Sequence, residues 1–245
     1  MKVKIGKTMY DSAYEPIMLV LDDLDKSNIT NMRPEATRYC SFPNDIPQED
    51  IKEFMGEISE PNLMNLEYLK RNCQRIYFFG LGFIQVVLNQ YERVHFYSDK
   101  LNDLSISEGW HNHRYNFTSK ILKGDFRQSL GVITNGDTHI LYNVNCGTGK
   151  DLPYSTEIPI GLQEVIMPCG YLTEHYGKGD SYNIFYNDFH YVCTVGNTIT
   201  YLKRGDYITE FAQAIRKKDQ DFQCPFTHKF TDEELWEIVE EIINN

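Results

Sequence analysis

The chain lacks long hydrophobic runs and an excess of basic residues, and each absence argues against a class of protein. No segment approaches the roughly 18 apolar residues of a membrane-spanning helix. The 245 residues carry 24 Lys and Arg against 35 Asp and Glu, a net charge of −11. Nucleic-acid phosphates attract clustered basic side chains, so this balance argues against general nucleic-acid binding. We therefore expect neither a membrane nor a nucleic acid as a partner.

Paired cysteines and a secretory signal are also absent from the sequence. The six cysteines are scattered, without a Cys-x-x-Cys pair, and the start Met-Lys-Val-Lys-Ile-Gly-Lys has no apolar run behind it. Free thiols in a reducing compartment are the usual state of such cysteines. The expected location is the cytoplasm.

What the sequence has in quantity is aromatic and apolar residues. The hydrophobic fraction is 41%, with 17 Tyr and 14 Phe, a composition that favours strands over a helical bundle. Short apolar runs predict strands, with Asn135-Gly136-Asp137 as a hairpin turn between two of them. These runs lie at 76–79, 83–88, 93–97, 111–122, 127–134, 138–144, 162–167, 171–176, 181–186, 190–195 and 198–203. Because no helices intervene, an all-β antiparallel sandwich or barrel is expected.

Helices are expected only outside this β-rich region. Residues 1–46 are irregular, and 47–58 and 62–73 have the texture of short helices. Thr231-Asp-Glu-Glu234 is a capping box that opens a C-terminal helix with an apolar stripe. We therefore divide the chain into an N-terminal segment (1–75), a β-barrel (76–207) and a C-terminal helical extension (208–245).

Two histidines in the sequence Gly-Trp-His-Asn-His suggest a metal site. Alternate side chains of an extended strand leave from one face, so His111 and His113 can point at one ion. His190 is the best third ligand, because it begins a strand after a turn that follows the Gly179 strand. His175, after Pro168-x-Gly170, is the rival.

These residues resemble the cupin superfamily. Its first motif is His-x-His, then Glu and a closing glycine, and Gly124 takes the glycine position if Phe117 stands at the Glu position. Gly179 and His190 have the spacing of the second motif, in which Phe185 and Asn187 replace its Pro and Gly. The resemblance implies a cupin-type antiparallel barrel or jelly roll, with His111, His113 and His190 as metal ligands.

The missing Glu moves the resemblance toward the three-His cupins, which include thiol dioxygenases. Those enzymes carry a similar stretch after the His-x-His pair, and here it reads Ser119-Lys120-Ile-Leu122-Lys-Gly124. The resemblance implies an Fe(II)-dependent dioxygenase that acts on a small molecule, with a thiol as one candidate substrate. Imidazole ligands also suit Zn and Ni, and Mn is a further alternative. Many cupins dimerise, so a homodimer is a family-level expectation.

Residues around the histidines are expected to complete the site. Each ligating imidazole needs an acceptor for its other ring nitrogen, and the candidates are Glu108, Asn116, Glu174 and Asp188. Four residues are expected to line the substrate cavity, with Arg127 holding a carboxylate: Tyr115, Arg127, Tyr182 and Tyr186. Cys193 follows His190 by three residues and could be a reactive thiol near the cavity, but burial as a small hydrophobic residue is expected. No catalytic base is evident.

Two other functions fit the same fold. One is an isomerase, lyase or hydrolase acting on a sugar or nucleotide-like metabolite, in which Zn, Mn or Ni polarises an oxygen. Glu108 or Glu174 facing the cavity would favour it, since proton transfer needs a base. The other is a non-enzymatic protein that binds a small ligand in the barrel mouth.

Overall fold

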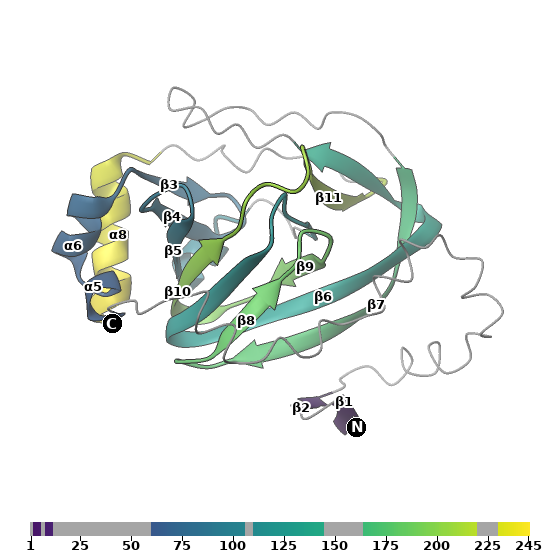
Figure 1. The fold of residues 1–245 in the computed structure, drawn as a ribbon, viewed down its shortest axis with the longest axis horizontal. Coiled ribbons are helices and arrows are strands. Elements are labelled where there is room, and N and C mark those ends of the chain that lie inside the picture. Colours follow the sequence, from purple (N-terminus) through teal and green to yellow (C-terminus); the bar gives the residue numbers. More distant parts are fainter. Residues whose placement is uncertain (1, 6–7, 12–59, 106–109, 145–163, 220–229) are drawn as a thin grey trace.

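The structure is a computed structural model that describes residues 2–5, 8–11, 60–105, 110–144, 164–219 and 230–245. The helix predicted at 47–58 and the candidate Glu108 lie outside the described residues. A two-stranded hairpin, β1 (Lys2–Ile5) and β2 (Thr8–Asp11), stands at the N-terminus. The site is formed by one large sheet, its connecting loops and the helices at one end of it (Figure 1).

The large sheet is antiparallel throughout and has nine strands in the described part of the chain. Its main path runs β11-β6-β10-β5-β4-β3, while β7, β8 and β9 pair with β6. The strands are β3 (Arg75–Phe79), β4 (Phe83–Val87), β5 (Glu92–Tyr97), β6 (Phe117–Val144), β7 (Glu164–Tyr176), β8 (Ser181–Ile184), β9 (Phe189–Val192), β10 (Val195–Arg204) and β11 (Ala212–Lys217).

Strand β6 organises the sheet, because five other strands pair with it (Figure 1). Its first part, to Asp125, pairs with β8 and β10, and its later part pairs with β7, β9 and β11. The pairing with β10 is irregular around Gly124, whose φ is 76°. A Cβ there would lie 2.3 Å from the Asn197 carbonyl oxygen. Gly124 therefore lies within β6, where only glycine fits, and does not end the strand.

Two details of the predicted strands are wrong. Asn135-Gly136-Asp137 is not a hairpin turn: Asn135 and His139 both pair with Ile166 of β7, so the intervening residues form an irregularity within β6. The two strands predicted at 162–167 and 171–176 are one strand, β7. In both places the long partner strand holds the segment extended, which overrides the local turn signal.

The β-rich antiparallel architecture is confirmed, whereas a closed barrel is not found. In the described residues the main strand path has two ends, β11 and β3. β11 also lies beyond residue 207, in the segment expected to be helical, and pairs with β6 from His139 to Val144. Hydrophobic periodicity cannot reveal such a pairing, because its partner lies about 70 residues away in the sequence.

The described helices gather at one end of the sheet (Figure 1). They are α5 (Glu60–Leu63), α6 (Leu66–Asn72), the short α7 (Asp99–Asn102) and α8 (Asp232–Asn244). The capping box of α8 is confirmed, with Thr231 and Glu234 exchanging hydrogen bonds. None of the described helices is both long and apolar enough to cross a membrane.

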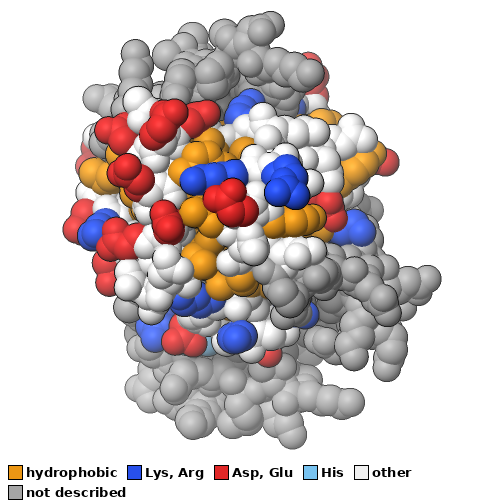
Figure 2. Space-filling model, turned by 90° about the vertical axis from the view of Figure 1, so that its left-hand side faces the viewer, with side chains coloured by type: hydrophobic (Ala, Val, Ile, Leu, Met, Phe, Trp, Pro, Cys, Tyr) orange, Lys and Arg blue, Asp and Glu red, His pale blue; other side chains and the backbone are white. Residues whose placement is uncertain are grey.

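The helical end encloses one of two main hydrophobic clusters. Leu69, Leu235 and Val239 pack there against Ile84 and Phe96 of the sheet. The Lys123 ammonium of β6 donates hydrogen bonds to the last carbonyls of α8, at 2.9 Å from each of the Ile242 and Ile243 oxygens. Figure 2 shows the outer face of this end, where acidic and basic side chains surround narrow apolar strips. The second cluster, which includes Phe117, Phe126, Tyr182 and Leu202, lies next to the histidines.

Candidate metal centre

The three candidate histidines meet because two short segments pair side by side. The His111 amide donates to the His190 carbonyl oxygen at 3.1 Å, and the His190 amide donates to the His111 oxygen at 2.9 Å. His111 also bridges to Ala214 of β11. The segment that carries the His-x-His pair is therefore held against both β9 and β11, which places its rings beside that of His190.

Asn112, between the two histidines, anchors this segment. Its side chain is 7% exposed. Its Oδ1 accepts a hydrogen bond from the Gln213 amide at 2.5 Å, and its Nδ2 donates to Gln213 Oε1 at 3.2 Å. Alternation in an extended segment places Asn112 on the side opposite His111 and His113. The anchoring of Asn112 to β11 therefore directs both histidines into the same space.

The resulting cluster has the dimensions of a metal site. One ring nitrogen from each of His111, His113 and His190 lies within 4.8 Å of the other two, and the Nε2 atoms of His113 and His190 are 2.9 Å apart. Two nitrogens bound at right angles to one ion, each about 2.1 Å from it, would be about 3.0 Å apart. Three imidazoles are also a donor set that divalent Fe, Zn, Cu and Ni accept. The residues therefore fit a metal ion.

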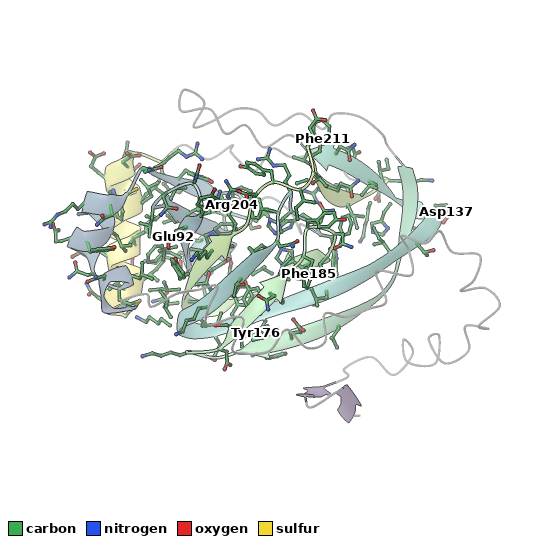
Figure 3. All side chains as sticks on the ribbon, viewed as in Figure 1. Glu92, Asp137, Tyr176, Phe185, Arg204 and Phe211 are labelled. Atoms are coloured by element: carbon green, nitrogen blue, oxygen red, sulfur yellow. The ribbon has the colours of Figure 1, made fainter. Side chains whose placement is uncertain are left out.

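A hydrogen-bonded chain behind His190 sets the tautomer of its ring. The Gln128 amide nitrogen donates to Glu174 Oε2 at 2.9 Å, so its Oε1 faces His190 Nδ1 at 3.2 Å. The Tyr176 hydroxyl donates to the same Glu174 oxygen at 2.7 Å; Tyr176 ends β7 beside β8 (Figure 3). Because an amide oxygen only accepts, Nδ1 of His190 carries the proton and Nε2 has a lone pair for a metal.

Burial keeps two of the three histidines neutral. It holds the pKa of both His113 and His190 well below the usual value of 6.5, and the neighbouring imidazoles lower both further. Arg93 and His95 add to the effect on His113. Only a neutral imidazole has a lone pair to give to a metal, so this environment favours ligation.

Phe117, which the sequence resemblance sets at the Glu position of the cupin motif, presents an apolar ring to the cluster. Its ring centroid lies 4.8 Å from that of His113, edge to face, and 6.2 Å from that of His190. Phe117 is 4% exposed and belongs to the second hydrophobic cluster. In the described residues no carboxylate joins the three histidines, so the donor set is uncharged.

The cluster opens into a cavity of about 360 Å³. Its walls come from β4, β5, the start of β6, β8, β9 and β10, together with α7 and adjoining loops. None of the described lining residues is acidic or basic apart from the histidines. They are Leu81, Phe83, His95, Tyr97, Asn102, Ser105, His111, His113, Phe117, Tyr182, His190, Tyr191, Val192, Cys193, Thr194 and Leu202.

The four residues expected to line the substrate cavity have different positions. Tyr182 does line it, and burial raises the pKa of its hydroxyl. Tyr115 packs on His113, with 5.6 Å between ring centroids, and Tyr186 binds Asn116 through its amide, but neither lines the cavity. Arg127 is exposed and lies outside the cavity, which corrects its expected role. Strand alternation explains this, because Phe126 and Gln128 point inward on either side of it.

The expected hydrogen-bond acceptors are also corrected. Glu174 reaches His190 only through Gln128. The Asn116 side chain accepts from the Tyr186 amide at 2.8 Å, and Asp188 accepts from the Phe185 amide at 2.9 Å, so both stabilise turns. Burial raises the pKa of Asp188. The rival ligand His175 is exposed on β7 and does not belong to the cluster.

Two functional candidates were missed from the sequence, and the expected burial of a third residue, Cys193, is wrong. Gln128 is 1% exposed and contacts His190, but a single glutamine in a strand has no recognisable spacing to its partner. His95 lines the cavity from β5. Its one sequence signal is the spacing to Tyr97, which places both residues on the same face of the strand. Cys193 is exposed at the cavity wall and is not a buried hydrophobe.

No family model matches this chain, and neither does any curated protein. Among solved structures, hydroquinone 1,2-dioxygenase PnpCD in complex with Cd²⁺ and 4-hydroxybenzonitrile aligns with 62% of this chain and 77% of its own, at 14% identity and a TM-score of 0.30. The hydroquinone 1,2-dioxygenase of Sphingomonas sp. TTNP3 with 4-hydroxybenzoate aligns with 49% and 62%, at 9% identity and a TM-score of 0.24. A likeness of this size establishes neither a shared fold nor a shared activity.

Proposed function

We propose that this protein is a metal-dependent dioxygenase of the cupin type that oxidises a small, uncharged molecule. The observation that carries the proposal is the uncharged three-histidine cluster at the wall of a mainly apolar cavity. His111, His113 and His190 would hold the ion, with Fe(II) as the favoured metal and Zn, Mn or Ni as alternatives. When bound, Fe(II) would supply the one-electron chemistry that lets dioxygen react with an organic substrate.

The protein's own residues have three tasks in this proposal. Gln128, fixed by Glu174, keeps the proton of His190 on Nδ1 and so keeps Nε2 available. Three protein ligands leave positions on a six-coordinate ion for substrate and dioxygen. The apolar walls, which include Phe83, Phe117 and Leu202, exclude water from the reacting groups.

The substrate would be small and neutral. In the described lining there is no Lys or Arg to pair with a carboxylate or phosphate, and no Asp or Glu to pair with an amine. Burying an unpaired charge in such a cavity is costly. A hydroxyl or a thiol would serve as the group that contacts the ion, and a thiol agrees with the sequence resemblance.

The metal-assisted isomerase, lyase or hydrolase has less support. Proton transfer in those reactions needs a base, and none of the described cavity residues is a carboxylate. Glu174 faces Gln128 and Tyr176, not the cavity.

Metal analysis and oxygen uptake test the proposal together. Protein purified without chelator, then reconstituted with Fe(II) under anaerobic conditions, is expected to bind one iron per chain. It is then expected to consume oxygen when a neutral thiol or phenol is added. His190→Ala is expected to lose the iron, whereas His175→Ala, which changes an exposed histidine outside the cluster, keeps it. Equal iron content in the two variants would refute the site. Stoichiometric iron without oxygen uptake across neutral substrates would refute the dioxygenase activity.

A further inference from the structure

One histidine that lines the cavity does not belong to the three-histidine cluster. His95 lies on β5, is 8% exposed and lines the same cavity as His111, His113 and His190. Its ring packs against Phe83, with 4.7 Å between centroids, and against Tyr97 at 6.3 Å. Both of these aromatic residues line the cavity as well. His95 is therefore a polar group set in an aromatic wall.

A row of side chains across three strands determines the state of this ring. Tyr77, Gln85 and His95 are direct neighbours in the register of β3, β4 and β5. The Gln85 amide nitrogen donates to the Tyr77 hydroxyl, which leaves Gln85 Oε1 facing His95 Nε2 at 3.0 Å. An amide oxygen accepts hydrogen bonds and cannot donate them, so the imidazole proton resides on Nε2.

The other nitrogen of His95 is therefore an acceptor. Burial, with a smaller contribution from Arg93, lowers the pKa of His95 to about 3, so the ring is neutral near neutral pH and Nδ1 keeps its lone pair. In the described part of the chain no donor contacts this nitrogen. Nδ1 is not one of the buried polar atoms without a partner, so it is open to the cavity, where a ligand that donates a hydrogen bond can bind it.

We propose that His95 is a positioning residue that accepts a hydrogen bond from the substrate, and that the substrate is a neutral aromatic or similarly apolar molecule bearing a hydroxyl group. The aromatic walls select the apolar body, and Nδ1 of His95 selects the donor. The chemistry of the cavity disfavours two other classes of ligand. Anions meet no basic partner among the described lining residues, and molecules without a donor leave Nδ1 unpaired. The inference rests on the cavity being the substrate site of the proposed function.

Binding of simple probes to the metal-free protein tests this without catalysis. Phenol and toluene have similar shapes, but only phenol donates a hydrogen bond. Phenol is expected to bind about tenfold more tightly than toluene, the size of one hydrogen bond to an acceptor in the cavity wall. Benzoate is expected to bind more weakly than both. In His95→Phe the preference for phenol over toluene is expected to vanish, while His175→Phe retains it.

A further measurement separates the role of His95 from misfolding. If His95→Phe does not fold, ¹⁵N-histidine NMR of the unmodified protein decides. The unprotonated Nδ1 resonance of His95 is expected to move with phenol but not with toluene, and a protonated Nδ1 would overturn the proposal. If the protein did not bind iron, the proposed function would be refuted, but the probe-binding results would still test the role of His95.

Discussion

The side-chain oxygen of Gln128 lies 3.2 Å from Nδ1 of His190, and this contact links a buried side chain of β6 to the three-histidine cluster. The two residues are 62 positions apart in the sequence, and β6 and β9 bring them together with Leu130 opposite His190. Because Glu174 holds the amide of Gln128, the orientation of His190 depends on two residues that do not contact its Nε2, the nitrogen that faces His113. The first prediction follows from this arrangement.

Replacing Gln128 by Leu is expected to weaken metal binding by about 10- to 100-fold, because His190 loses the acceptor that fixes its tautomer. Titration with Zn(II) against a competing chelator measures the change. Gln90→Leu changes an exposed glutamine and serves as the matched control. Unaltered affinity in Gln128→Leu would mean that the hydrogen bond does not support ligation.

Phe117→Glu is expected to destabilise the metal-free protein by about 3 kcal/mol, because it removes a buried ring and buries a carboxylate. Metal is expected to recover much of this loss, since the new carboxylate would stand beside His113, where Phe117 now lies. Urea unfolding with and without Zn(II) measures both effects. Phe117→Leu, which adds no charge, should show no such extra recovery. Equal metal effects in the two variants would contradict the position assigned to residue 117.

Gly131→Ala is expected to disturb the segment that carries His111. A Cβ at Gly131 would lie 2.4 Å from the Trp110 ring, so the indole must move, and His111 is the next residue. We expect a loss of about 1 to 3 kcal/mol in the free energy of unfolding, together with weaker metal binding. Gly205→Ala is the control, because its added Cβ would meet only the Asn116 oxygen at an ordinary 3.6 Å. Similar stabilities of the two variants would show that Trp110 does not need the space above Gly131.

Acid is expected to destabilise the metal-free protein in part through His95. The pKa of His95 is about 3 in the folded protein and 6.5 in an unperturbed chain. Between these values the unfolded state binds more protons, so the free energy of unfolding falls as the pH falls, by up to about 1.4 kcal/mol per pH unit for one histidine. At pH above 6.5 this contribution is constant. His95→Gln is expected to reduce the slope of stability against pH, as measured by urea unfolding. An unchanged slope would indicate that His95 is not buried.

Local sequence pattern determined much of the secondary structure and part of the three-histidine cluster. Alternating and aromatic runs indicated the β-rich architecture, and the capping box at Thr231 indicated the start of α8, because both signals depend only on neighbouring residues. The His-x-His spacing placed two imidazoles on one side of an extended segment for the same reason. The choice of His190 over His175 came from its spacing to Gly179 within the resemblance to cupins.

Tertiary structure alone decided which other side chains reach the site. Arg127 points outward and Gln128 inward, and the sequence cannot distinguish them, because a one-residue change of register exchanges the two faces of a strand. Gln85 reaches His95 only because β4 pairs with β5 in one particular register. Backbone pairing likewise brings His111 beside His190, although the two residues are 79 positions apart in the sequence. Sequence pattern thus identified the three histidines of the cluster, while strand pairing set their protonation, their support and the character of the cavity.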